Sequence, residues 1–225
     1  MIGWVAMAAA AQGMNTAPAD PAAVPSTPAA VVSGTTVTHA GEKVRVHVPA
    51  TATYAGAERF NLYGVADAEI HVFVEADADK TMKRLYWVQF ESYLPSNDHR
   101  YNYADGNTRF DLWGSPTWLV WGPRPANAPV RAGSDRESVM RILAKGGYAI
   151  PPEVLNVRMV QMLDDPEGTG RGRRELMIIY SENLAPTGKT LAELVADGKL
   201  VDAAWKPLEQ PLIDRATTSV RVERL

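Results

Sequence analysis

His71 and nearby carboxylates are the side chains best suited to proton transfer. An imidazole titrates near neutral pH, and a carboxylate beside it orients its tautomer or raises its pKa. If the alternating segments 69–75 and 84–94 pair through the polar turn between them, their non-aliphatic faces align and bring His71 and Glu69 near Glu91. We therefore take His71, Glu69 and Glu91 as candidate catalytic residues. A one-residue shift in register would reverse one face, and these residues would then belong to an ordinary sheet surface.

Aromatic side chains gather just after these segments and favour an apolar ligand pocket or a partner surface. Three tryptophans and two tyrosines fall within the 21 residues 101–121. Flat amphipathic rings can line such a pocket, and they can equally fill a core. Arg158 lies between the apolar Val157 and Met159, so we expect it to be partly buried and to need a partner such as a substrate carboxylate. The candidate ligand-binding residues are Trp87, Gln89, Tyr93, Tyr101, Tyr103, Trp113 and Arg158.

The sequence contains no motif that predicts a metal site or a cofactor. Its four histidines form no HxH, HxxxH or HExxH pattern, and a site built from His47, His71 and Glu91 would require neighbouring strands to bring them together. No GxSxG motif marks a serine nucleophile, and Ser134 is better explained as a helix cap. The glycine- and arginine-rich run 168–174 is neither a Walker loop nor a dinucleotide fingerprint, and we interpret it as an exposed turn that could attract an anion.

Composition excludes several classes of protein. The chain has 225 residues, of which 46% are hydrophobic and 22% charged, so it can form an ordinary core. Lys and Arg number 23 against 26 Asp and Glu, a formal charge of −3, which provides no broad positive surface for nucleic acid. Cysteine is absent, which excludes disulfides, thiolate nucleophiles and cysteine metal sites.

The first part of the chain differs from the rest. Residues 1–13 are apolar and end in small residues, which resembles a secretory signal, and residues 14–38 are a run of Ala, Pro and Thr typical of a disordered linker. Residues 39–225 are predicted to form a single domain. This organisation favours a periplasmic or secreted bacterial protein, with a cytoplasmic protein as the alternative. No apolar run is long enough for a transmembrane segment.

The body contains strands in runs and helices toward its end. Two-residue alternation predicts strands, and capping-box patterns at Ser134–Glu137 and Thr190–Glu193 predict the starts of helices. The expected strands are 42–48, 58–63, 69–75 and 84–94, followed by an antiparallel hairpin of 155–163 with 175–182. Residues 110–121 are expected to form two short strands, or one strand and a rim loop. Three helices are expected. The first begins after Ser134, the second begins after Thr190 and ends at Gly198, and the third spans 207–218.

These patterns predict an α+β fold. It has a mostly antiparallel, curved β-sheet with two or three helices packed on one face, preceded by the disordered Ala/Pro-rich segment. Our leading functional hypothesis is a soluble exported domain that binds a small apolar or aromatic ligand, or a protein partner, without nucleic acid, metal or cofactor. The alternative is a cofactor-independent hydrolase, lyase or isomerase that uses the His71–carboxylate pair. A third hypothesis is a structural role in which the linker tethers the body to an envelope component.

Overall fold

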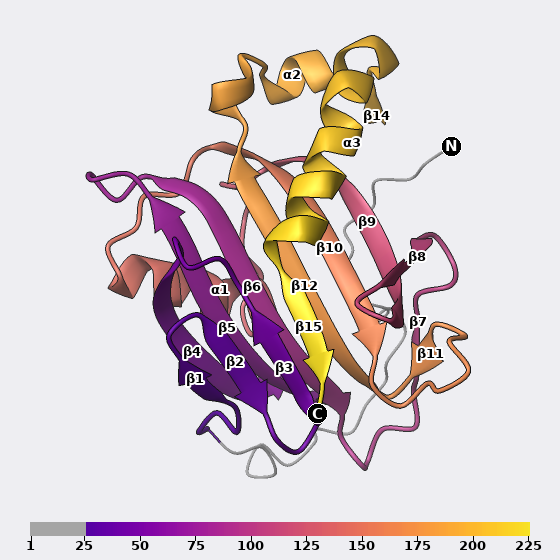
Figure 1. Cartoon of the computed structure of the whole chain (residues 1–225). Helices are drawn as coiled ribbons and strands as arrows, with labels where there is room; N and C mark the ends of the chain where they lie inside the picture. The colour runs from indigo at the N-terminus through magenta and orange to yellow at the C-terminus, as the bar shows by residue number, and fades with distance from the viewer. Residues whose placement is uncertain (1–25) are drawn as a thin grey trace.

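A seven-stranded antiparallel sheet forms the centre of the protein. The computed structural model describes residues 26–225, and it orders the strands β4-β5-β6-β12-β10-β9-β8 in a curved, open sheet (Figure 1). The strands are β4 (Thr53–Leu62), β5 (Ala66–Ala76), β6 (Met82–Tyr93), β8 (Thr108–Leu112), β9 (Ser115–Pro125), β10 (Glu153–Met162) and β12 (Arg174–Asn183). Most of the central strands are buried on both faces, which explains why apolar residues occur at both odd and even positions.

A second, four-stranded sheet packs against one face of the large sheet. Its order is β1-β2-β3-β15, and it combines the start of the described chain with its last strand. The strands are β1 (Val31–Ser33), β2 (Thr36–His39), β3 (Val44–His47) and β15 (Arg221–Arg224). Residues 31–38 are therefore strand or turn, although their composition had placed them in the linker. Alternate residues of β2 and β3 are valines that point into the core. Pairing of β2 with β3 compensates for the weak apolar content of residues 31–38.

Helices cover both faces of the large sheet rather than one. Helix α3 (Asp202–Ser219) packs with the four-stranded sheet on one face, which we call the α3 face, and helix α1 (Asp135–Lys145) packs on the opposite α1 face. In Figure 1, α3 and the four-stranded sheet lie in front of the large sheet and α1 lies behind it. Each face consequently has its own hydrophobic core. The predicted α+β class with a mostly antiparallel sheet is confirmed.

The connection between β9 and α1 crosses the α1 face. Strand β9 is sixth in the sheet order, whereas α1 contacts mainly β4 and β5 at the other side. The intervening residues 126–134 must therefore pass over β10, β12 and β6. The Arg131 guanidinium stacks at 4.2 Å from the ring of Tyr63, in the turn between β4 and β5. The Arg136 guanidinium reaches back 2.7 Å to the Ala126 carbonyl, so both ends of the connection are anchored.

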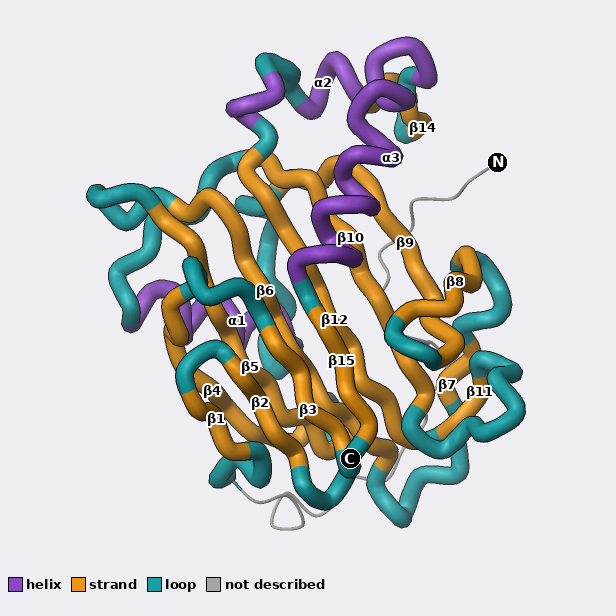
Figure 2. The backbone as a smooth tube through the Cα atoms, in the orientation of Figure 1, coloured by secondary structure: helices purple, strands orange, loops and turns teal. Residues whose placement is uncertain are grey.

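Local sequence signals set the ends of the short elements. Thr190 and Glu193 form the predicted capping box of helix α2 (Leu191–Leu194). Gly198 does not end this helix, because Asp197 and Gly198 both have positive φ and form the two-residue turn of a small hairpin. That hairpin joins β13 (Val195–Ala196) to β14 (Lys199–Leu200); the remaining short elements are β7 (Tyr101–Asn102), β11 (Arg171–Gly172) and the 3₁₀ turn η2 (Ala185–Thr187) (Figure 2).

Two further comparisons with the sequence concern the ends of the chain. Helix α3 is longer than the predicted 207–218, because it starts at Asp202 and accommodates Pro207 and Pro211 inside it. The predicted signal-like segment 1–13 and residues 14–25 of the predicted linker lie outside the described residues. Within residues 26–225, no helix has the length and apolar character needed to cross a bilayer.

The start of α1 is held by Ser134, whose side-chain oxygen accepts a hydrogen bond from the Glu137 amide. Replacing Ser134 by Ala should reduce the free energy of unfolding by about 1 kcal/mol, because the Glu137 amide loses its acceptor. Ser134→Gly should reduce it by only a few tenths of a kcal/mol, as is usual for glycine at this position. Urea denaturation measures both values. Ser33→Ala, at an exposed strand position, serves as the control, and an equal effect of Ser33→Ala and Ser134→Ala would contradict a capping role.

Candidate functional site

The register of β5 on β6 separates the three predicted catalytic residues. His71 lies opposite Val88, and Glu69 lies opposite Phe90, so both point to the α3 face with these apolar neighbours. Glu91 lies opposite Ala68 and points to the α1 face with Gln89 and Trp87. The expected approach of His71 to Glu91 is therefore not formed. The register differs by one residue from the one that we expected, which is the shift that reverses a strand's faces.

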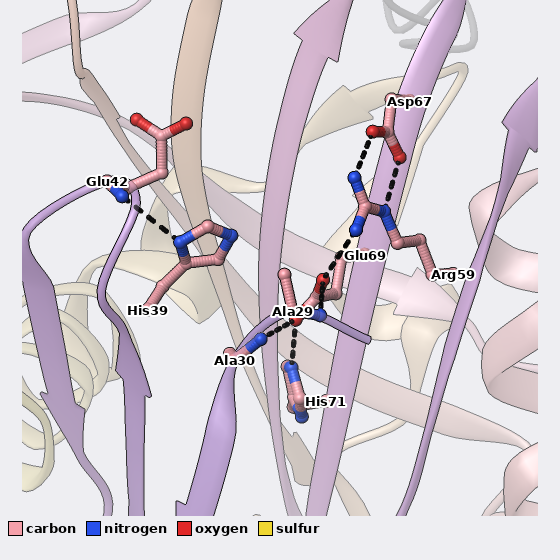
Figure 3. A network of polar contacts seen from close by, with 8 residues as sticks. All are labelled: Ala29, Ala30, His39, Glu42, Arg59, Asp67, Glu69 and His71. Carbon is pink, nitrogen blue, oxygen red and sulfur yellow. Dashed lines mark hydrogen bonds and ion pairs between the residues drawn. The ribbon is translucent and has the colours of Figure 1, made fainter. Parts of the chain in front are cut away.

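His71 and Glu69 do form a close, buried pair. The imidazole Nε2 lies 2.9 Å from Glu69 Oε1, and the two side chains are only 1% and 3% exposed (Figure 3). Because the carboxylate can only accept, Nε2 carries a proton in this contact and Nδ1 is free to accept from the Tyr54 hydroxyl at 3.3 Å. Both ring nitrogens are thus already engaged by the protein.

Glu69 also anchors the chain that leads into β1. Its carboxylate oxygens accept hydrogen bonds from the backbone amides of Ala29 and Ala30 at 2.6 and 2.8 Å (Figure 3). Burial acts to raise the pKa of Glu69, but the hydrogen bonds from His71 and from these two amides outweigh it and lower the pKa to about 2. This geometry holds the Glu69 carboxylate in place and fixes the segment before β1 against strand β5. Both carboxylate oxygens accept hydrogen bonds from the protein, so neither is free for a substrate.

On the α1 face, a stack of tyrosines leads to Glu91. The rings of Tyr93 and Tyr101 stack with centroids 4.3 Å apart, and Tyr103 continues the stack at 6.2 Å. The Tyr101 hydroxyl donates to Glu91 Oε1 at 2.6 Å, and Gln89 Nε2 donates to Glu91 Oε2 at 2.5 Å. A chain of polar contacts thus crosses an otherwise apolar layer, with Trp87 donating in turn to Gln89 at 2.9 Å.

Glu175 of β12 faces Glu91 directly across the strands. The two residues are register partners, so their Cβ atoms are about 5 Å apart, and both side chains point to the α1 face. Burial raises the pKa of Glu91 to about 7. Burial, followed by repulsion from Glu91, raises the pKa of Glu175 well above its usual range, and the neighbouring Tyr103 hydroxyl and Arg158 only partly oppose this. Two carboxyl groups so close together in a buried site cannot both ionise near neutral pH.

Arg158 of β10 lies beside this pair without an ion-pair partner. Its side chain is 9% exposed and donates to Asn107 Oδ1 at 3.0 Å, while the guanidinium carbon lies 5.2 Å from the centre of the Tyr103 ring. No carboxylate among residues 26–225 comes within 4.0 Å of its nitrogens. Its buried Nε has no hydrogen-bond partner in this part of the chain.

Arg124 and Asp135 complete the group of charges on this face. Arg124 of β9 lies opposite Val154, four residues from Arg158 along β10, or about 13 Å. Burial, together with repulsion from Arg158 and Arg136, lowers the pKa of Arg124, and its Nε is also buried without a partner among residues 26–225. Asp135 at the start of α1 has a raised pKa, mainly because of burial. We call Glu91, Glu175, Tyr101, Tyr103, Arg124, Asp135 and Arg158 the Arg158 cluster.

Most of the predicted ligand-binding residues lie together on this face. Tyr101 and Tyr103 belong to the cluster with Arg158, and Trp87, Gln89 and Tyr93 adjoin it. Trp113 does not, because it has positive φ in the tight turn between β8 and β9 and packs toward the α3 face. The sequence reasoning missed Glu175, Arg124 and Asp135. Glu175 lies at the start of β12, a strand that the sequence predicted correctly together with its pairing to β10. Nothing in the sequence indicated that β12 also pairs with β6.

The other sequence candidates serve the fold. Within residues 26–225, no group of three or more His, Asp or Glu is placed to hold a metal ion. Arg173 of the glycine-rich run donates to the Leu94 carbonyl, and Arg174 pairs with Glu42. These two arginines are therefore engaged by the protein itself.

A hollow on the α3 face also gathers charged side chains. It has a volume of about 220 Å³ and is lined by Pro49, Glu75, Arg84, Tyr86, Arg215, Thr218 and Ser219. Arg84 pairs with Glu75 at 2.7 Å, and Arg215 pairs with Glu182 at 2.5 Å. The charges there are balanced within the protein, which distinguishes this hollow from the Arg158 cluster.

Comparison with protein-family models, curated proteins and solved structures finds no match for this chain. Function must therefore be inferred from the geometry of the site.

Glu69→Gln should reduce the free energy of unfolding by about 2–3 kcal/mol at neutral pH. The folded-state pKa of about 2 lies below the ordinary value, so the stabilisation is complete above about pH 4.5 and is lost as the pH falls toward 2. Urea unfolding at neutral pH and at about pH 3 should show the difference from wild type shrinking in acid. Glu58→Gln, which removes an exposed pair with Arg141, is the control, and a gap that does not shrink in acid would refute the assignment.

Glu175→Gln should make the protein less sensitive to alkaline pH. Burial raises the pKa of Glu91 to about 7 and also raises the pKa of Glu175, so their contribution to stability is complete below about pH 4.5 and is lost as the pH rises through these raised pKa values. The variant should match wild type within about 0.5 kcal/mol at pH 5 and exceed it by about 1–2 kcal/mol at pH 8.5 in urea unfolding. Glu167→Gln in an exposed loop should change neither value. A variant that loses stability equally at both pH values would contradict the shared-proton description.

Proposed function

We propose that the protein binds a small apolar or aromatic ligand at the Arg158 cluster. The observation that carries this proposal is the concentration of unsatisfied buried polar atoms at one place. Arg158 Nε, Arg124 Nε and Glu175 Oε2 account for three of the seven buried side-chain atoms without a partner among residues 26–225. Such atoms are rare in folded proteins, and an absent partner is one explanation for them.

The surroundings of the cluster suit a ligand with an apolar body. Trp87, Met177 and Ile179 extend from it along the same face, and Ile179 is only partly buried. The connection 126–134 passes over this region, while α1 itself stays over β4 and β5. Binding sites for small molecules commonly combine apolar walls with a few convergent polar groups, as this face does.

Catalysis by His71 is the weaker proposal. A general base needs a free lone pair directed at a substrate, whereas Glu69 and Tyr54 occupy both imidazole nitrogens. The Glu69 oxygens also accept two backbone amides. This arrangement favours a structural role for the pair. A protein partner in place of a small ligand is disfavoured by the depth of the cluster, since Arg158 and Glu175 are 9% and 1% exposed. Export of the chain remains a separate proposal, which the composition of residues 1–13 favours.

Titration with N-phenyl-1-naphthylamine, a neutral aromatic probe whose emission increases in apolar surroundings, tests the proposal. We expect saturable binding to wild type, and Ile179→Trp should weaken it about tenfold or more, because the larger ring would occupy the position that we propose for the ligand. Val31→Trp introduces the same ring at an exposed position of β1, on the other side of the large sheet, and should leave binding unchanged. Absence of saturable binding, or equal loss in the two variants, would overturn the assignment.

A further inference from the structure

We infer that the ligand of the Arg158 cluster is an amphipathic monoanion, with a carboxylate held by Arg158 and Arg124 and an apolar tail along Trp87, Met177 and Ile179. This inference rests on the proposed function and specifies its ligand class. It starts from two arginines, Arg158 and Arg124, whose Nε atoms are buried and have no hydrogen-bond partner among residues 26–225. Guanidinium groups match carboxylates in geometry and charge, and such bonds are stronger than those between neutral groups.

The two arginines differ from the other arginines that line the sheet. Arg84, Arg215 and Arg59 lie 2.5–2.7 Å from Glu75, Glu182 and Asp67, respectively. Arg158 instead donates to the neutral Asn107 amide and lies beside the Tyr103 ring, and no carboxylate among residues 26–225 comes within 4.0 Å of its nitrogens. A buried guanidinium without a counter-charge is costly, so an anion that enters the cluster would relieve that cost.

The carboxyl groups of the cluster supply only part of that counter-charge. Glu91 already accepts from Tyr101 and Gln89, and Glu175 is kept protonated near neutral pH by burial and by Glu91. The charged and titratable groups that face Arg158 are Glu91 on β6, Glu175 on β12, Arg124 on β9, Asp135 and Arg136 on α1, and Tyr103 in the β7 loop. With the Glu pair sharing a proton, three arginines face two negative charges, which favours one added anion over a cation.

Glu175 can also contribute directly to the recognition of a carboxylate. Its Oε2 is buried and has no partner among residues 26–225. As a protonated carboxyl it can donate a hydrogen bond, so it would add a neutral donor to the two arginines. The same carboxyl in its ionised form would repel the ligand, and binding should therefore weaken above neutral pH.

The tail is placed by the apolar residues of the same face. Met177 and Ile179 lie two residues apart on β12 and therefore point to the same face. Trp87 of β6 lies opposite Ile179, and Val72 of β5 lies opposite Trp87. These side chains belong to the hydrophobic core of the α1 face. A flexible Met beside branched side chains adapts to an alkyl chain more readily than a rigid aromatic wall does.

A matched set of twelve-carbon probes tests the inference by isothermal titration calorimetry. We use dodecanoate, 1-dodecanol and dodecylammonium below their aggregation concentrations at neutral pH. Wild type should bind dodecanoate about ten- to a hundredfold more tightly than the alcohol, as expected for charge-assisted bonds, and should bind the ammonium most weakly. Arg158→Met and Arg124→Met should each reduce this preference to about threefold or less while retaining binding of the alcohol. Arg109→Met removes an exposed arginine outside the cluster and should change nothing.

The outcomes separate the two proposals. If no probe binds, the proposed function fails and the inference fails with it. If the alcohol or the ammonium binds as tightly as dodecanoate, ligand binding stands but the anionic head group is wrong. The comparison within wild type requires no variant, so a poorly folded Arg158→Met protein does not prevent a decision. A preference for dodecanoate that survives in both arginine variants would also overturn the assignment.

Discussion

The large sheet is buried on both faces, and this constraint governs the rest of the molecule. Strands β5, β6, β12 and β10 send alternate residues into two separate cores, so every polar side chain in them needs a partner on its own face. The four-stranded sheet and α3 provide that cover on one face. On the other face, α1, its connection to β9 and the segment that carries Tyr101 and Tyr103 provide it. The register between strands therefore determines which polar groups meet.

The two faces solve the problem of buried charge differently. On the α3 face each buried carboxylate is matched by specific donors. Glu69 accepts from two backbone amides and from His71, and Glu182 accepts from Tyr180 and Arg215. Charges in such complete networks hold elements in fixed positions. The contacts of Glu69 fix the approach to β1, which explains how residues of linker-like composition become part of a sheet.

On the α1 face the network is incomplete. Two carboxyls oppose each other across β6 and β12, and the Nε atoms of two arginines have no acceptor among residues 26–225. Neither feature favours folding, since a buried like-charge pair raises both pKa values and an unpaired guanidinium is costly to desolvate. Proteins commonly keep such locally unfavourable arrangements where they bind or react with other molecules. The site we propose is therefore located by what the fold leaves unsatisfied, rather than by a sequence motif.

The sequence alone determined most of the local structure. The alternation in β5 and β6, the capping residues of α1 and α2, and the hairpin of β10 with β12 follow from side-chain periodicity and from short-range hydrogen bonds that the chain encodes within a few residues. The sequence also named the tyrosines, Trp87 and Arg158 as candidate ligand-binding residues, but it did not predict that they share one face. The relation between strands was decided only in the tertiary structure. A register depends on the packing of two whole faces, and a shift of one residue moved Glu91 away from His71 and placed it opposite Glu175, 84 positions later in the sequence.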